Sequence, residues 1–168
     1  MSKLGLKRQL RRCSLLAFLL LPFLAGTTLA AGGGGSSSSS ARTIPADPDY
    51  EAAVAAIKKE DFPLAIQKLE IYTARMPNDA DAWNWLGYAN RKSGNVDLAF
   101  DDYDKALRID PDHRGAHEYV GEAYLMVGNL AKAEEHLRVL DKLCLFPCEE
   151  FSDLKQAVAD YKARNGVQ

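Results

Sequence analysis

Apolar side chains recur every three or four positions from residue 47 to residue 164, which is the spacing of one face of an α-helix. Glycine, proline and polar clusters divide this region into seven segments, and none is predicted to be a strand. We therefore predict an all-α fold with helices at 47–59, 63–75, 80–93, 97–109, 114–127, 131–143 and 149–164. The residues expected to fill its core are Trp83, Leu86, Tyr103, Leu107, Val120, Tyr124, Leu137 and Leu140.

The pattern repeats along the chain at an interval of 34 residues. Ala65, Ala99 and Ala133 are separated by this interval. Other positions share it, namely Leu69, Tyr103 and Leu137 and the pairs Gly87 and Gly121, Gly94 and Gly128, and Pro77 and Pro111. A period of this length indicates a stack of similar helix pairs.

The unit from Ala80 to His113 resembles a tetratricopeptide repeat, because the pattern W-x-x-L-G-x-x-Y, A-x-x-x-F, P is met at Trp83, Leu86, Gly87, Ala99 and Pro111. It departs at Asn90, where tyrosine is usual, and at Tyr103, where phenylalanine is usual. The resemblance extends from Ala46 to about Cys148. It implies a solenoid of three helix-turn-helix repeats, at 46–79, 80–113 and 114–148, and a binding scaffold whose partner it does not name.

Glycine is expected to supply the turn between the two helices of a repeat, at Gly94 and Gly128. Glu60 takes this place in the first repeat, at little cost if the backbone there is not left-handed. Gly87 and Gly121 should allow close helix approach, so that a larger side chain would cost about 1–3 kcal/mol.

The segment 149–168 follows the repeats and has an apolar face opposite a polar one. The apolar residues are Phe151, Leu154, Val158 and Tyr161. A stacked array exposes the apolar flank of its last unit, so this segment is predicted to be a capping helix.

The first thirty residues join a basic start to the apolar run LLAFLLLPFLAG and a small-residue stretch, which is typical of a secretory signal peptide. An uncleaved N-terminal anchor is the alternative. Residues 31–45 are rich in glycine and serine and are expected to form a flexible linker. We therefore expect an exported protein of the bacterial periplasm, with no stable membrane insertion after cleavage.

Loss of residues 1–30 would remove five of the 21 Lys and Arg residues, leaving 16 against 23 Asp and Glu, a net charge of −7. An acidic body lacks the general attraction for phosphate on which nucleic-acid affinity depends. Nucleic acid is therefore not expected as a partner.

Two cysteines, Cys144 and Cys148, remain after the signal segment. In an oxidising compartment they are expected to form a disulfide that fastens the capping helix to the last repeat. The alternative is a metal or thiol-transfer site, since soft thiolates suit Cu(I).

No phosphate loop, nucleophile elbow or zinc pattern occurs in the sequence, so no catalytic residue, metal site or cofactor is predicted. His113 and His117 are four residues apart, as two metal ligands on one helix would be. His117 takes the core position that Trp83 holds one repeat earlier, and a structural role is expected for it.

The tetratricopeptide resemblance also implies a binding groove lined by the first helix of each repeat. Its positions fall on Tyr50, Val54, Ile57 and Lys58, on Asn84, Tyr88, Arg91 and Lys92, and on Glu118, Glu122, Leu125 and Met126. The groove thus runs from apolar through basic to acidic. Tyr50, Val54 and Trp85 stand where a chaperone-binding subset of the family has Lys or Asn, so that partner is not implied.

These features predict a protein-interaction scaffold or assembly adaptor, not an enzyme, that binds a client segment in this groove. Apolar anchors are expected near Val54, Ile57 and Leu125, and a client carboxylate near Arg91 and Lys92. A structural subunit that packs through its convex face is a further hypothesis.

Overall fold

The computed structural model describes residues 47–146 and 148–166. The predicted signal peptide and linker, at 1–30 and 31–45, lie outside the described residues. The described chain is all α-helical, with α1 at Pro48–Ile57, α2 at Phe62–Arg75, α3 at Ala80–Lys92, α4 at Val96–Ile109, α5 at Arg114–Met126, α6 at Leu130–Leu143 and α7 at Glu149–Asn165. The seven predicted helices are confirmed, and each observed end falls within two residues of the predicted one.

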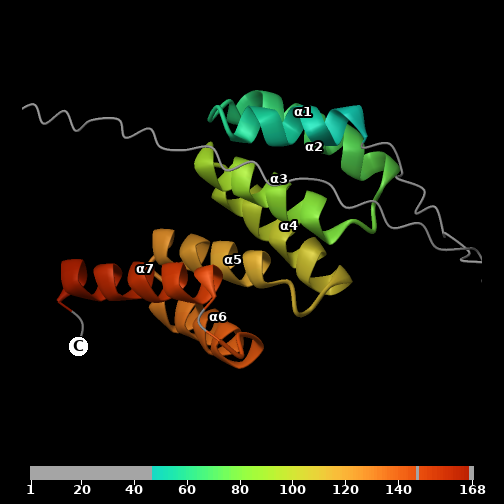
Figure 1. The fold of residues 1–168 in the computed structure, drawn as a ribbon. Coiled ribbons are helices and arrows are strands. Elements are labelled where there is room, and N and C mark those ends of the chain that lie inside the picture. The colour runs from blue at the N-terminus through green and yellow to red at the C-terminus, as the bar shows by residue number, and fades with distance from the viewer. Residues whose placement is uncertain (1–46, 147, 167–168) are drawn as a thin grey trace, which may run out of the picture. The chain divides into compact units, whose positions relative to one another are not determined.

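The helices between residues 47 and 166 stack as antiparallel pairs in chain order, α1 with α2, α3 with α4 and α5 with α6 (Figure 1). The first helices touch one another, α1 with α3 and α3 with α5. Within the described part of the chain, the second helices α2, α4 and α6 make no such contacts with one another. The first helices therefore form the inner face of the stack.

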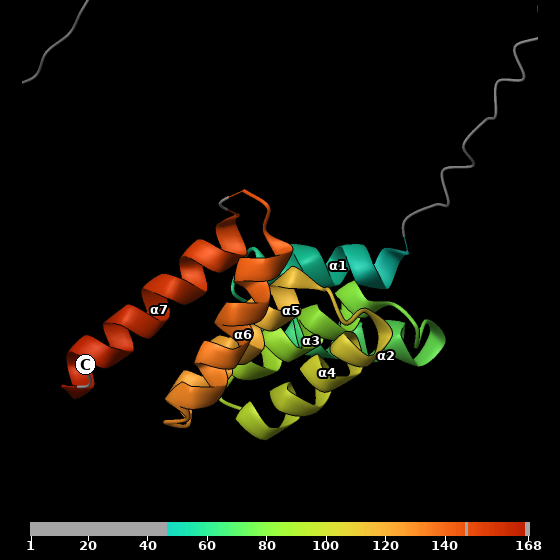
Figure 2. The ribbon, with the colours of Figure 1, turned by 90° about the horizontal axis from the view of Figure 1, so that it is seen from below.

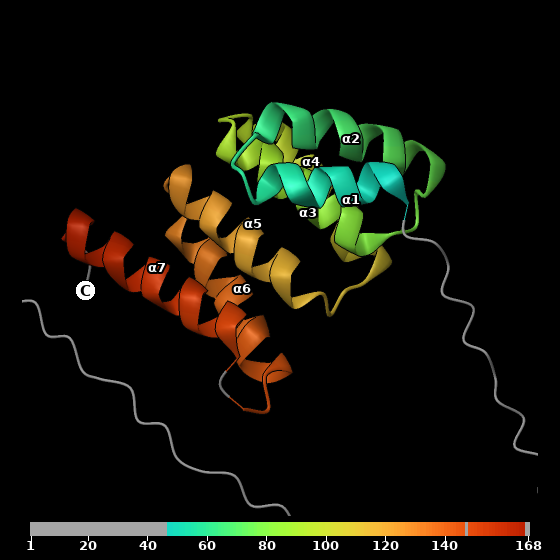
Figure 3. The ribbon, with the colours of Figure 1, turned by 45° about the horizontal axis from the view of Figure 1, so that its top comes forward.

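The last helix, α7, packs against both α5 and α6 (Figure 3). Leu154 and Val158 of α7 are buried in one cluster with Leu140 of α6. The turn that joins α6 to α7 lies at one end of both helices (Figure 2). In the described residues, none of the helices has the length and apolar character needed to cross a membrane.

The turn inside each helix pair passes through a left-handed residue. Gly94 and Gly128 adopt φ values of 85° and 80°, where glycine has no steric penalty. Glu60 adopts φ 57°, so its backbone is also left-handed. The condition under which Glu60 would cost little is therefore not met, because a side chain in this region costs roughly 1–2 kcal/mol.

The two helix glycines are close-packing sites, but they face different partners. A Cβ atom at Gly87 would lie 2.6 Å from the ring of Tyr103, within the same repeat. A Cβ atom at Gly121 would lie 2.6 Å from Leu154, which belongs to α7. The third repeat thus uses its glycine to seat the capping helix.

Candidate functional site

The inner face carries the twelve groove positions predicted from the sequence, but their exposure differs. Lys58, Lys92 and Met126 are exposed, and Tyr50, Val54, Ile57, Tyr88 and Glu122 are half-buried. Four positions are buried, namely Asn84, Arg91, Glu118 and Leu125. These four differ from the other positions, because a buried side chain is not available to contact a client.

Arg91 is enclosed by partners on every side. Its guanidinium lies 2.6 Å from the carboxylate of Glu122 on α5, and its Nε donates to the hydroxyl of Tyr103 at 3.3 Å. The guanidinium carbon lies 5.5 Å from the ring centroids of both Tyr88 and Tyr119, within cation–π range. Arg91 therefore ties α3, α4 and α5 together, and its charge is already neutralised by Glu122.

A client carboxylate near Arg91 stays a prediction, but Arg91 already has a carboxylate partner within the chain, Glu122. Of the predicted basic pair, Lys92 alone is exposed, and its Nζ lies 5.9 Å from the ring centroid of Tyr88. Exposed positive charge at this place on the inner face comes from Lys92 and from Arg164 of α7, which line the same hollow.

Leu125 is likewise not a free apolar anchor. It is buried in the cluster that contains Leu154 and Val158 of the capping helix. α7 leans against α5 and covers most of Leu125, which leaves only its edge in the lining of a neighbouring hollow. Met126, one residue further on, stays 55% exposed.

Three aromatic rings form a continuous half-buried patch on α3 and α5. The ring centroids of Trp85 and Tyr88 lie 5.7 Å apart, those of Tyr88 and Tyr119 5.0 Å, and those of Trp85 and Tyr119 6.4 Å. We call these three residues the inner aromatic surface. Trp85 and Tyr119 were absent from the predicted groove, although their separation of one repeat length signals equivalent positions.

A cleft borders this surface, between α3, α5 and the start of α7. It has a volume of about 320 Å³, and Trp85 and Tyr119 contribute to its lining together with Asn84 and Glu118. Burial, together with the negative charges of Glu122, Asp153 and Glu150, raises the pKa of Glu118 to about 8. The cleft beside the aromatic patch is thus rich in acidic side chains.

The fold and repeat pattern agree with comparisons to known proteins. The family described as tetratricopeptide repeat matches residues 50–114. This stretch belongs to the tetratricopeptide-repeat family. The match covers nearly all of the first helix pair, α1 and α2, and the whole unit from Ala80 to His113.

Solved tetratricopeptide-type structures have a similar fold. The translocator chaperone SycD of Yersinia enterocolitica type III secretion superposes with a TM-score of 0.64 at 20% identity, over 71% of this chain and 84% of that one. SycD in complex with a peptide of the translocator YopD gives a TM-score of 0.60 at 22% identity, over 69% and 88% of the two chains. At these identities the likeness shows the fold alone.

A curated relative is Superkiller protein 3 of Saccharomyces cerevisiae, which is 26% identical over 91 residues. The match covers 54% of this chain but only 6% of that much longer protein. This tetratricopeptide-repeat chain therefore corresponds to a small part of the yeast protein.

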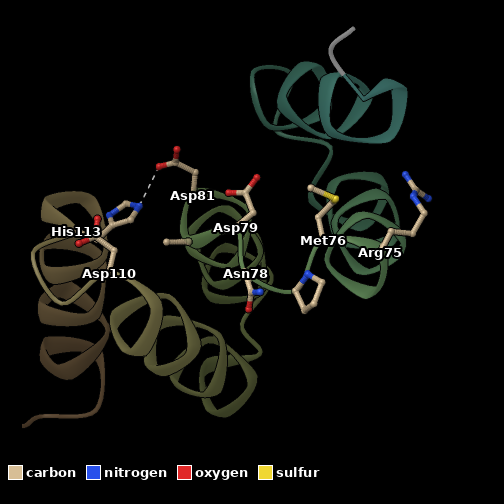
Figure 4. A pocket seen from close by; sticks show the side chains of 9 residues that line it. Arg75, Met76, Asn78, Asp79, Asp81, Asp110 and His113 are labelled. Atoms are coloured by element: carbon tan, nitrogen blue, oxygen red, sulfur yellow. Dashed lines mark hydrogen bonds and ion pairs between the residues drawn. The ribbon is translucent and has the colours of Figure 1, made fainter. Parts of the chain in front are cut away.

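The largest hollow described in this tetratricopeptide-repeat protein lies at the turns between repeats (Figure 4). Its carboxylates have hydrogen-bond partners within the chain. Asp79, for example, accepts from the hydroxyl of Tyr72 at 2.7 Å and caps α3. His113 caps α5 by accepting from the amide of Ala116, so its Nε2 donates to Asp81 at 3.0 Å. We assign this hollow to the structure of the turns.

His117 is structural, as predicted. It is buried, and its Nε2 donates to the carbonyl of Pro111 at 2.9 Å, which leaves its Nδ1 to accept from Nδ1 of His136 at 2.8 Å. Burial and the neighbouring His117 lower the pKa of His136 to about 4. This pair could not be predicted from local spacing, because the two residues are on different helices.

Cys144 and Cys148 face each other at the turn before α7. Their Cα atoms lie 5.8 Å apart, within the range that a disulfide spans, and the structure joins the two sulfurs. No cluster of three or more His, Cys, Asp or Glu residues suited to a metal occurs among residues 47–146 and 148–166.

Proposed function

We propose that the protein binds a segment of a client protein on its inner aromatic surface and thereby serves as an interaction scaffold or assembly adaptor. The observation that carries this proposal is the contact of Trp85, Tyr88 and Tyr119 in one half-buried patch. Aromatic residues dominate interface hot spots because they bury large areas with few rotatable bonds.

The charges beside the aromatic patch support a bound segment of mixed character. Lys92 is exposed at one side, and the acidic cleft lies at the other. Val54, Ile57 and Met126 remain predicted apolar contacts, since each is at least partly exposed. The similar fold of SycD, whose complex holds a translocator peptide, supports a peptide-binding role by analogy.

Site-specific photocrosslinking tests the proposal. A photoreactive residue at Lys92, on the inner face, is expected to crosslink the client, whereas one at Leu98, which is 55% exposed on α4, is not. Tyr88→Ala should weaken the Lys92 crosslink by speeding client dissociation. Crosslinks through Leu98 but not Lys92 would move the binding site to the outer helices.

We further propose that the protein acts in the periplasm after loss of residues 1–30. The basic, apolar and small-residue order at the N-terminus supports export. Mass spectrometry of the exported protein is expected to find a chain that begins near Ala31, and an intact Met1 there would contradict the proposal.

Export also favours a Cys144–Cys148 disulfide over the alternative of copper or thiol transfer. The pair closes a very short loop beside α7, so the bond would hold the capping helix to the last repeat. Thiol titration of protein isolated without reductant or metal should find neither cysteine reactive. Two reactive thiols would favour the transfer function instead.

A further inference from the structure

The cleft beside the inner aromatic surface is lined by acidic side chains from three helices. These are Asp81 of α3, Glu118 of α5, and Glu149, Glu150 and Asp153 of α7. Two of the five are partly compensated, because His113 donates to Asp81 and Arg114 lies 3.8 Å from Glu150. The others give the cleft a net negative character.

Glu118 is the decisive residue, because it is buried without a partner. Only 8% of it is exposed, and no hydrogen bond or ion pair reaches its carboxyl group from the described residues. Its carboxyl oxygens are not fully enclosed, so they are open to the cleft. The fold therefore retains a carboxyl group that lines the cleft and that has no hydrogen-bond or ion-pair partner in the described chain.

Asn84 also lines the cleft and carries a second acceptor without a partner. It is 5% exposed, and its side-chain oxygen is buried with no hydrogen-bond donor among the described residues. Two acceptors from neighbouring helices, the Asn84 oxygen and the Glu118 carboxylate once it ionises, suit a ligand group that only donates. Lysine and arginine side chains are such groups.

The lining of the cleft selects an organic cation over a metal ion. Trp85 and Tyr119 line it, and aromatic faces attract ammonium and guanidinium groups. The acidic side chains here do not converge as a metal-binding cluster in the part of the chain that the structure describes. A flexible apolar stem that ends in a cation would touch both the rings and the acceptors.

We propose that this cleft binds the cationic side chain of a lysine or arginine in the client segment, with Glu118 and Asn84 as its acceptors and Trp85 and Tyr119 beside its stem. This proposal rests on the proposed function, since the cation belongs to a segment that lies on the inner aromatic surface. It adds a specificity element that the predicted apolar-to-acidic groove did not identify.

The test uses three probe peptides, acetyl-Leu-Lys-Leu-amide, acetyl-Leu-Arg-Leu-amide and acetyl-Leu-Gln-Leu-amide, titrated into the full chain at low salt and followed by NMR. The lysine and arginine probes should shift the side-chain signals of Asn84 and Trp85. At least one of them should bind about tenfold more tightly than the glutamine probe, and the stronger of the two identifies the preferred cation. High salt should reduce the difference.

Matched variants assign the effect to the cleft. Glu118→Gln with Asp153→Asn should abolish the advantage of the cationic probes. Asp97→Asn with Asp101→Asn removes the same charge from exposed positions on α4 and should preserve it. The proposal is overturned if the three probes bind equally, if neither cationic probe binds, or if the cleft variant still prefers them. The crosslinking at Lys92 decides the proposed function separately.

Discussion

Two buried charges lie close together on the inner face, and the fold treats them in opposite ways. Arg91 has a carboxylate, a hydroxyl and two aromatic rings around its guanidinium. Glu118 is buried to a similar degree but receives no hydrogen bond or ion pair from the described residues. Burial alone therefore does not show whether an ionisable side chain is structural or available to a ligand. The presence or absence of partners within the chain distinguishes the two cases.

The difference also shows why the charge pattern of the groove was misleading. The sequence indicated a basic site at Arg91 and an acidic surface at Glu118 and Glu122, each open to a client. In the structure Glu122 pairs with Arg91, so these two charges cancel. What remains for a partner is Lys92 on one side and the acidic cleft on the other.

Removing the Arg91 side chain is expected to lower the free energy of unfolding more than any of the substitutions that follow. Arg91→Ala leaves Glu122 and the hydroxyl of Tyr103 without their partner. Removing one member of a buried ion pair typically costs about 3–5 kcal/mol, and partial exposure of Glu122 favours the lower end. Urea denaturation measures the free energy of unfolding. Lys92→Ala, its exposed neighbour, should change it by less than about 0.5 kcal/mol, and equal losses would show that Arg91 is not structural.

Gly87→Ala should have the next largest effect, because it presses on Tyr103, whose hydroxyl accepts from Arg91. A rigid ring buried inside the repeat has little room to move, so a loss of about 1–3 kcal/mol is expected. Gly121→Ala presses instead on the terminal methyl groups of Leu154 in α7, which can rotate away. Thermal unfolding should rank Gly87→Ala as the more damaging, and the reverse order would mean that the α5–α7 contact is the tighter one.

Glu118→Gln should stabilise the protein, by about 1 kcal/mol at pH 8. The pKa of Glu118 is about 8 in the folded chain, above its ordinary value of 4.5. As pH rises between these values, the unfolded chain loses this proton while the folded chain keeps it, so the parent loses stability. The variant lacks this loss, and its advantage should vanish below about pH 4.5. Asp101→Asn, an exposed control on α4, should give no such advantage in thermal unfolding at either pH.

The smallest effect is expected away from the inner face, at the turn of the first repeat. Glu60→Gly relieves a left-handed backbone at φ 57°, but glycine also makes the unfolded chain more flexible. The net gain should be under about 1 kcal/mol by urea denaturation. The same substitution reversed, Gly94→Glu, should destabilise, and a stable Gly94→Glu variant would mean that these turns tolerate side chains.

Much of the fold could be predicted because it repeats. Helical spacing and turn residues placed the helices within two residues of their ends and marked Leu140 as core, and the 34-residue period marked Tyr103 and the turn glycines correctly. Local spacing carries this information, since each repeat contacts mainly its neighbours. Glu60 lies one repeat before Gly94, which pointed to the same turn, but its side chain gave no sign that the backbone would be left-handed there.

The state of the groove residues could not be predicted in the same way. Burial of Leu125 depends on how far α7 leans over α5, and neutralisation of Arg91 depends on the reach of Glu122 from the next repeat. Both depend on distances between helices, which the spacing of a sequence repeat does not specify. Equivalent positions of different repeats therefore share a place on the inner face but not a role.

The most direct test is the titration of the Glu118 carboxyl group, followed by its 13C chemical shift from about pH 5 to about pH 10. The charged groups around it are Arg91 and Asp81 of α3, His113, Glu122 of α5, and Glu149, Glu150 and Asp153 of α7. The expected pKa of Glu118 is about 8, caused mainly by burial. The pKa is expected to fall when the lysine probe is present, because the cation stabilises the carboxylate. A pKa near 4.5 without the probe would contradict this account, since Glu118 would then have a partner or water that satisfies its charge.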